Sequence, residues 1–382
     1  MFFYMKRQFD IDWIRVLATL AVFIYHCLMF FNPWAWHVKN NITDPTYITS
    51  VSLFMSSWLM PIFFVMSGMS SYYALKKRTG KVFIKERLAR LGIPLLFGVM
   101  ILTPPQVYME RISHGQYSGS FFQWYPHYFD GVYLDIGGTG NFAFVGLHLW
   151  YLLVLLVFSI ATLPLFLKKK PAITRAMKPY QFYLLAIPLM VLSALVDVVR
   201  LGGWDISYYL IIFLYGYFIC TKESFRKMTQ KLLPINLGIS IFTTVFFIYG
   251  FFSGMSSEHS IVGVLFAAVK ALNCWTWVLV IFTLADRYLS FSNKWLTYGS
   301  QAAMPFYVLH QPVIVTLGFF VADLEWSIPV KLLLLLVVSF VIIMCIYHFI
   351  ISKLSILRVL FGIKGSHTHR ERRANPDIRI NG

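Results

Sequence analysis

Apolar segments long enough to cross a membrane recur along the whole chain and restrict its fold more than any other feature. A membrane-spanning helix needs about 20 mostly apolar residues, a length that WIRVLATLAVFIYHCLMFF at residues 13–31 already meets. Hydrophobic residues make up 58% of the 382 positions and charged residues only 13%, which is typical of an all-α, polytopic membrane protein. The ten predicted spans are residues 13–31, 50–74, 91–108, 146–167, 181–199, 206–221, 233–252, 261–284, 296–320 and 328–350.

The distribution of Lys and Arg predicts the orientation of the chain. With the N-terminus inside, the inner segments hold 28 of the 33 basic residues, and the outer loops hold only Lys39, Arg111 and Arg200. This asymmetry follows the positive-inside rule, so we expect both termini to be cytoplasmic. Basic residues beside anionic headgroups also account for the formal charge of +17, without a nucleic-acid partner.

The spans and loops predict two regions. Residues 1–350 form one integral-membrane domain, and residues 351–382 form a basic, disordered cytoplasmic tail. Outer loops at 32–49 and 109–145 are rich in aromatic residues, which suits either stacking on sugar rings or anchoring at the membrane interface. The four cysteines show no CxxC spacing, so neither a disulfide framework nor a metal site is expected.

Ionisable residues at membrane depth are costly and often functional, and the first span carries three of them. Asp12 and Arg15 are three residues apart, so they share a helical face. His26 lies fourteen residues beyond Asp12, close to the same face and about 21 Å further along the axis. With Thr19 they form a polar stripe, in which His26 is a candidate general base. The alternative is an ion pair that only orients the helix and a histidine that only bonds a neighbouring carbonyl.

Two further motifs lie at the second and third spans. Ser67 and Gly68 suit close helix packing or a locally opened backbone. Arg87 and Arg90 stand three apart before the third span, where two planar guanidinium groups suit a phosphate clamp. Nearby lysines leave a simple cytoplasmic anchor as the alternative.

Three candidates lie further along the chain. His148 falls near the outer mouth of the fourth span and His310 in the middle of the ninth. Lys270 lies within the eighth span, where its long side chain can either reach the membrane surface or serve the site.

Five motifs give the chain a family resemblance. They are DIDWIRVLATLAVFIYH, FFVMSGMSS, RLARLGIP, HLWYLLVLL and FYVLHQPVI, and they occur in family order across nearly the whole sequence. In these motifs the chain resembles acyltransferase family 3, the bacterial integral-membrane O-acyltransferases. That family includes glucan succinyltransferases and polysaccharide O-acetyltransferases.

The resemblance implies a ten-span enzyme of the bacterial cytoplasmic (inner) membrane. It would take an acyl group from cytoplasmic acyl-CoA, acetyl-CoA rather than succinyl-CoA by frequency, and deliver it to a hydroxyl of an extracytoplasmic glycan. By matching position, Arg15 and His26 are essential, and Arg87 and Arg90 hold the donor. No permanently bound cofactor is implied. Some members of the family carry a C-terminal esterase-like domain, whereas a short tail is expected here, so the membrane domain itself or a separate acyl-accepting or esterase-like partner would complete transfer.

The residues and the resemblance together give a working hypothesis. His26 acts as a general base or a transient acyl carrier, and Asp12 orients Arg15. The main alternative is a transporter or flippase for a lipid-linked saccharide or an organic anion, in which the same residues line a pathway. A non-catalytic scaffold or sensor subunit is the third possibility.

Overall fold

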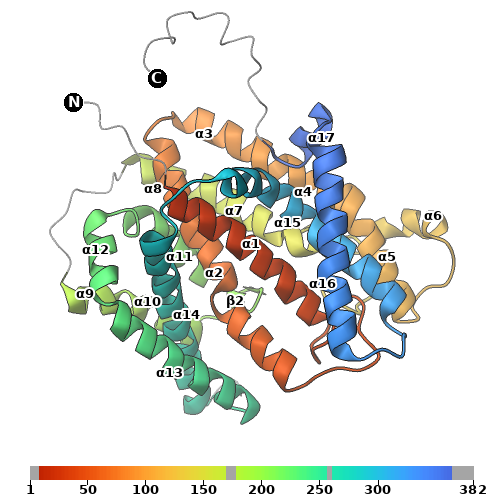
Figure 1. The fold of residues 1–382 in the computed structure, drawn as a ribbon, viewed down its shortest axis with the longest axis horizontal. Coiled ribbons are helices and arrows are strands. Elements are labelled where there is room, and N and C mark those ends of the chain that lie inside the picture. Colours follow the sequence, from red (N-terminus) through yellow and green to blue (C-terminus); the bar gives the residue numbers. More distant parts are fainter. Residues whose placement is uncertain (1–7, 169–177, 256–259, 364–382) are drawn as a thin grey trace, which may run out of the picture.

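A computed structural model describes residues 8–168, 178–255 and 260–363, and this part of the chain is almost entirely helical (Figure 1). Its only sheet is the two-residue hairpin of β1 and β2. The α-helices and strands are α1 Phe9–Met29, α2 Tyr47–Leu75, α3 Gly80–Arg87, α4 Ile93–Phe97, α5 Thr103–Ser113, α6 Phe121–Trp124, α7 Trp150–Ala161, α8 Leu163–Lys168, α9 Pro179–Leu184, α10 Ala186–Leu195, β1 Arg200–Leu201, β2 Trp204–Asp205, α11 Ile206–Phe218, α12 Glu223–Lys231, α13 Leu233–Phe252, α14 Ile261–Tyr288, α15 Lys294–Val321, α16 Ile328–Cys345 and α17 Ser355–Leu360.

The helices confirm an all-α polytopic membrane protein. Seven helical segments of the described residues are long and apolar enough to cross a membrane. The other three predicted spans correspond to shorter apolar helices at Leu147–Ala161, Pro179–Leu195 and Ile206–Phe218. A total of ten spans and two cytoplasmic termini therefore remain predictions.

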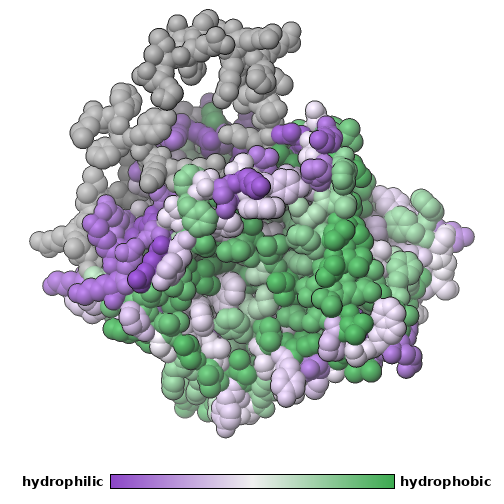
Figure 2. All heavy atoms as spheres, in the orientation of Figure 1, coloured by the Kyte–Doolittle hydropathy of each residue, from purple (hydrophilic) through white to green (hydrophobic). Residues whose placement is uncertain are grey.

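The surface has the polarity of a membrane protein. Figure 2 shows hydrophobic residues across the middle of the visible face, with hydrophilic residues gathered mainly at its upper left. The helices α13 and α16, on opposite sides of the view in Figure 1, bury only 28% of their most apolar windows, whereas α2 and α15 bury 67% and 61%. The central helices α2 and α15 thus form the interior of the protein, and the peripheral helices α13 and α16 expose apolar side chains on its surface.

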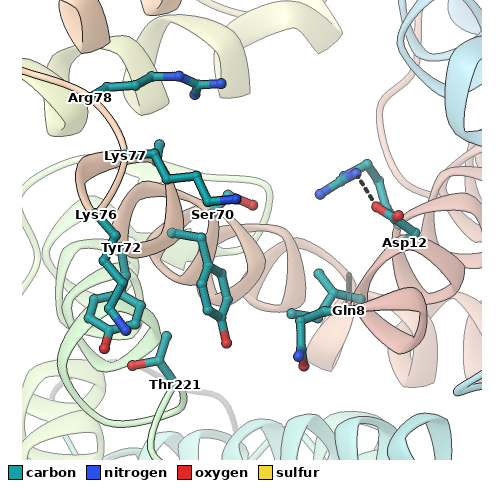
Figure 3. A pocket seen from close by; sticks show the side chains of 12 residues that line it. Gln8, Asp12, Ser70, Tyr72, Lys76, Lys77, Arg78 and Thr221 are labelled. Carbon is teal, nitrogen blue, oxygen red and sulfur yellow. Dashed lines mark hydrogen bonds and ion pairs between the residues drawn. The ribbon is translucent and has the colours of Figure 1, made fainter. Parts of the chain in front are cut away.

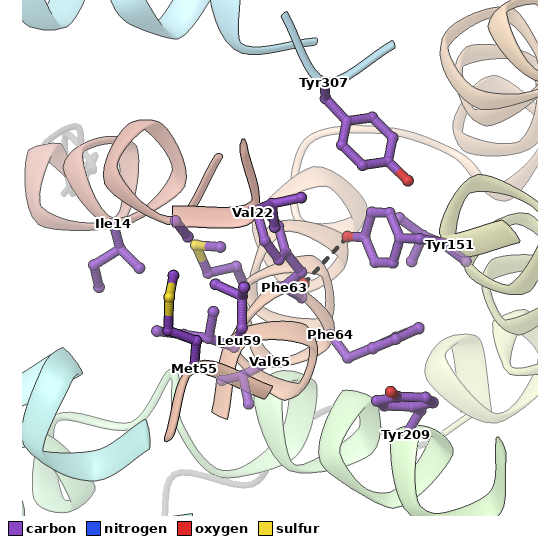
Figure 4. Packing of buried hydrophobic residues seen from close by; sticks show 14 of the residues in the cluster. Ile14, Val22, Met55, Leu59, Phe63, Phe64, Val65, Tyr151, Tyr209 and Tyr307 are labelled. Carbon is purple, nitrogen blue, oxygen red and sulfur yellow. Dashed lines mark hydrogen bonds between the residues drawn. The ribbon is translucent and has the colours of Figure 1, made fainter. Parts of the chain in front are cut away.

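The core forms where α1, α2, α7, α11 and α15 meet. Figure 4 shows apolar side chains of these helices interleaved around Phe63 and Phe64 of α2. Phe64 stacks on Tyr209 of α11 with ring centroids 4.5 Å apart, and the Tyr151 hydroxyl donates to the Phe63 carbonyl over 3.3 Å. Such a densely packed interior fixes the polar side chains that share these helices.

Glycines bring α2 and α11 into backbone contact. A Cβ added at Gly68 would lie 2.1 Å from the Phe213 carbonyl oxygen, and one at Gly216 would lie 2.2 Å from the Val65 carbonyl oxygen. Of the two roles considered for the Ser67–Gly68 pair, close packing therefore describes Gly68.

Gly68→Ala is expected to destabilise the protein, because neither backbone can yield to the new methyl group. Overpacking of this kind costs about 1–3 kcal/mol, and a lower thermal midpoint of the detergent-purified protein would reveal it. The matched control is Gly238→Ala in α13, where an added Cβ meets nothing within 4 Å. Equal midpoints for the two variants would contradict the tight crossing.

The third span is longer than predicted and continuous from Gly80 to Ser113. Two π-helical turns, Leu88–Gly92 and Gly98–Leu102, join α3, α4 and α5. The predicted outer loop at 109–145 therefore begins too early, because Glu110 and Arg111 belong to α5 and are buried. The predicted span stops at residue 108, whereas the helix continues to Ser113 and the two charged side chains pair inside the protein.

The predicted tail is also partly ordered. The helix α17 lies within residues 351–382, a segment for which disorder was expected, and its Arg358 lines the cavity described below. Residues 364–382 lie outside the described part of the chain.

Candidate active site

A cavity of about 620 Å³ opens between α1, α2, α7, α15 and the first π-helical turn. Its polar lining is dominated by arginines, since Arg15, Arg87, Arg90 and Arg358 all contribute to it. Arg87 and Arg90 face the same cavity because one helical turn separates them. Arg15 reaches it from the first half of α1. Four guanidinium groups around one cavity make a site for an anionic, phosphate-bearing ligand.

Hydrogen bonds hold two of these arginines in place. The Arg15 guanidinium donates to the Asp12 carboxylate over 3.0 Å, as their spacing predicted. Arg87 donates to the Ser71 hydroxyl over 2.8 Å. Each bond uses part of a fork of five N–H donors, so donors remain for a ligand.

A second cavity, of about 580 Å³, continues from the first at the inner end of α1 (Figure 3). Arg15 and Ser70 line both cavities. Figure 3 shows Lys77 and Arg78 across the open space from Asp12. The basic side chains of this second cavity, Lys76, Lys77 and Arg78, lie at the end of the helical bundle that is predicted to be cytoplasmic.

The other end of the first cavity is closed by hydroxyl groups. Ser67 and Tyr151 both line it, and their side-chain oxygens are 2.7 Å apart. Thr19, one helical turn beyond Arg15, and Tyr307 of α15 complete this end. Three of the four residues of the predicted stripe thus face the cavities, but His26 is not among the lining residues.

Behind Tyr307 lies a cluster of three histidines. The Tyr307 hydroxyl donates to the His148 carbonyl over 2.5 Å. The His148 and His310 rings meet edge to face at 5.0 Å, and His26 and His310 share a hydrogen bond of 2.8 Å between Nδ1 and Nε2 respectively. Side chains from α1, α15 and the turn before α7 therefore converge, although 284 residues separate His26 from His310.

The hydrogen bonds assign the protons of this cluster. His310 Nδ1 lies 2.5 Å from the Tyr307 carbonyl oxygen, which can only accept, so Nδ1 carries the proton. For neutral rings, His310 Nε2 then accepts from His26 Nδ1. His26 is left with a lone pair on Nε2, the atom that a general base or nucleophile uses.

The comparisons with known proteins show the family of the chain. Residues 8–348 match the family whose description is acyltransferase domain, family 3. The chain belongs to acyltransferase family 3. It is 24% identical over 340 residues to proteins named glucans biosynthesis protein C from Salmonella heidelberg, Salmonella typhi and Salmonella typhimurium, covering 82% of this chain and 84% of each relative. No solved structure matches the chain.

One atom of the acyltransferase's histidine cluster lacks a partner. His148 donates from Nε2 to the Val308 carbonyl over 3.1 Å. Its Nδ1 is buried and has no hydrogen-bond partner among the described residues. A buried acceptor without a partner thus lies beside His310, and a functional role for His148 stays a prediction.

A buried carboxylate binds the outer loops of the acyltransferase to this cluster. Glu110 accepts from His37 Nδ1 over 2.5 Å, from the Tyr133 hydroxyl over 2.8 Å and from the Gly137 N–H over 2.9 Å. The other ring nitrogen of His37 lies 3.0 Å from the side-chain nitrogen of Gln311, the residue after His310. We call Glu110, His37 and Gln311 the outer clamp.

Spacing within single helices did not reveal the outer clamp or Arg358. His37 and Glu110 are 73 residues apart and lie on segments that were read as loops. For Glu110, the signal in the sequence is a carboxylate at the end of an apolar run. For Arg358, it is a single basic residue within the short apolar stretch SILRVL.

Lys270 lies apart from the acyltransferase site. Its ammonium donates to the Gly203 carbonyl over 2.6 Å and sits 4.3 Å from the centre of the Trp204 ring. Neither of these partners lines the basic cavity or touches the histidines. Lys270 therefore stabilises the β1–β2 hairpin, which is a sufficient reason for a lysine at that depth.

Proposed function

We propose that the protein is an O-acyltransferase of the bacterial inner membrane that moves an acyl group from cytoplasmic acyl-CoA to a hydroxyl of an extracytoplasmic glycan. The observation that carries the proposal is the succession of arginine-lined cavity, hydroxyl-lined end and histidine cluster along one path. Acyl-CoA has the matching order of groups, with phosphates at one end and the thioester at the other.

The names of the relatives support a glucan as the acceptor. Their name assigns them to the biosynthesis of glucans, so a glucan hydroxyl is the acceptor we propose for this chain. The aromatic outer loops, which pack around Trp124 and Tyr128, lie at the end of the protein where such a polymer would arrive.

The proposed chemistry assigns one proton to one atom. The acceptor hydroxyl oxygen bonds to the thioester carbonyl carbon while His26 Nε2 takes the hydroxyl proton. The C–S bond then breaks, and the leaving thiolate recovers that proton from His26 as free coenzyme A. The products are the glycan ester and the thiol. In the alternative order, His26 Nε2 first forms an acyl-imidazole and then passes the acyl group on.

Tyr307 lies between the cavity that would hold the acyl donor and the histidine cluster that would take the proton. It lines the end of the cavity, and its ring centroid lies 5.7 Å from that of His310. An acyl group at the end of the cavity is therefore one side chain away from the histidine cluster.

Liposomes containing the purified protein test the proposal. With labelled acetyl-CoA outside and a glucan oligosaccharide inside, we expect label on the oligosaccharide and free coenzyme A outside. Succinyl-CoA in a parallel reaction identifies the preferred acyl group. Label that enters as intact thioester or as a free anion would instead establish transport and overturn the proposal.

A further inference from the structure

A buried hydrogen-bond donor without a partner lies beside His26. The indole ring of Trp36 stacks on the His26 ring at a centroid distance of 5.3 Å and an interplanar angle of 23°. Trp36 is 7% exposed, and its Nε1 is buried with no hydrogen-bond partner among the described residues. Buried polar atoms of this kind are uncommon in folded proteins, so each one needs an explanation.

The indole N–H limits what that explanation can be. It is a donor only, so the missing partner is an acceptor such as a carbonyl, alkoxide or water oxygen. The stacking of the two rings places this donor beside His26, the base proposed above.

The loop that carries Trp36 is held rigidly. The next residue, His37, is fixed by the outer clamp to Glu110 and Gln311, both nearly or fully buried. The Trp36 and His37 rings are themselves in contact at 5.0 Å.

The base of the loop is fixed as well. The Lys39 ammonium donates to the Met29 carbonyl over 2.6 Å and also to the Asn32 carbonyl, which binds the loop to the end of α1. Burial lowers the pKa of Lys39 to about 8. Trp36 thus lies in a short loop that His37 anchors to α5 and α15 and that Lys39 anchors to the end of α1, the helix carrying His26.

We propose that Trp36 is a further catalytic residue, whose Nε1–H donates to the carbonyl oxygen of the acyl group being transferred at His26. The assignment rests on the function proposed above. As the acceptor hydroxyl oxygen adds to the carbonyl carbon, the π electrons of the C=O bond move onto the carbonyl oxygen. The indole N–H stabilises the oxyanion that forms there. The electron pair re-forms the C=O bond when the C–S bond breaks. The hydroxyl proton passes through His26 Nε2 to the thiolate, and the indole keeps its own proton. A donor fixed before the reaction begins is well suited to this role.

The outer clamp is then a positioning device. Its buried carboxylate holds His37 in one orientation, and His37 holds Trp36 against His26. Glu110, His37 and Gln311 therefore act through Trp36 without touching the acyl group.

Trp36→Phe is the test, because phenylalanine keeps an aromatic ring against His26 but removes the N–H. In the liposome assay with acetyl-CoA, release of free thiol gives kcat and the donor KM. Loss of one such donor lowers kcat by about 10²–10³-fold, and we expect a fall of this size with an unchanged donor KM.

Trp58→Phe is the matched control. Trp58 Nε1 is likewise buried and without a partner among the described residues, but its side chain lines an apolar groove between α1, α2 and α14. This variant should keep the wild-type kcat, and both variants should keep the wild-type thermal midpoint.

The outcomes separate this inference from the proposed function. A Trp36→Phe protein with wild-type kcat, while His26→Ala is inactive, would overturn the role of Trp36 and leave the acyltransferase intact. A raised donor KM with unchanged kcat would also overturn it, since the indole would then only bind the ground state. No thiol release by the wild-type protein with either acetyl-CoA or succinyl-CoA would overturn both.

Discussion

Replacing His26 with alanine is expected to lower acyl transfer by about 10²–10⁴-fold, the usual contribution of a general base. The substitution removes the Nε2 lone pair that the bond to His310 leaves exposed for chemistry. Initial rates in the liposome assay measure the effect, and acyl-CoA binding should stay near the wild-type level because His26 does not line the basic cavity.

His348→Ala is the control for this prediction. His348 also lies in an apolar helical segment and has a hydrogen-bonded ring, 3.2 Å from the Tyr298 hydroxyl, but it is far from the cluster in the chain and not part of it. Its replacement should leave the rate unchanged. Comparable rates for His26→Ala and the wild type would refute the base assignment. Label attached to the quenched wild-type protein, and absent from His26→Ala, would select the acyl-imidazole route.

Replacing Arg87 and Arg90 together with alanine is expected to raise the donor KM by at least about tenfold. Hydrogen bonds to charged groups contribute about 1.5–3 kcal/mol, and one such bond already corresponds to a factor of ten or more. The value of kcat should change little, because these guanidinium groups line the cavity and the three histidines do not. Rates over a range of acetyl-CoA concentrations separate the two constants.

Lys227→Ala is the matched control for the arginine pair. Lys227 is basic and lies at the end predicted to be cytoplasmic, but it is exposed, paired with Glu223 and absent from both cavity linings. It should keep the wild-type KM. If the double variant responds to donor concentration as the wild type does, the arginines anchor the protein to the membrane and do not bind the donor.

The local parts of the site could be predicted from the sequence. The three-residue spacing of Asp12 and Arg15 fixed their contact, because helix geometry relates residues one turn apart. The apolar runs predicted the membrane fold for the same reason: length and polarity along one segment determine whether it can cross a bilayer.

Contacts between distant segments could not be predicted in this way. Nothing in the spacing of His26 and His310 says that their rings meet, and both were singled out separately. The outer clamp was missed because Glu110 looked like the start of a loop, whereas its charge is satisfied by three donors from two other segments. Lys270 was included because a lysine at membrane depth is unusual, but a carbonyl and an aromatic ring account for it.

The long separation between His26 and His310 has a consequence for biosynthesis. The ribosome delivers α1 first and α15 close to the end, so a growing chain holds His26 without its partner until nearly all the helices have been inserted. The set of arginines that line the cavity is complete only when Arg358 has also been made. We therefore expect truncated or stalled chains to be catalytically inactive in the membrane, because the histidine cluster and the arginine-lined cavity form only when the chain is nearly complete.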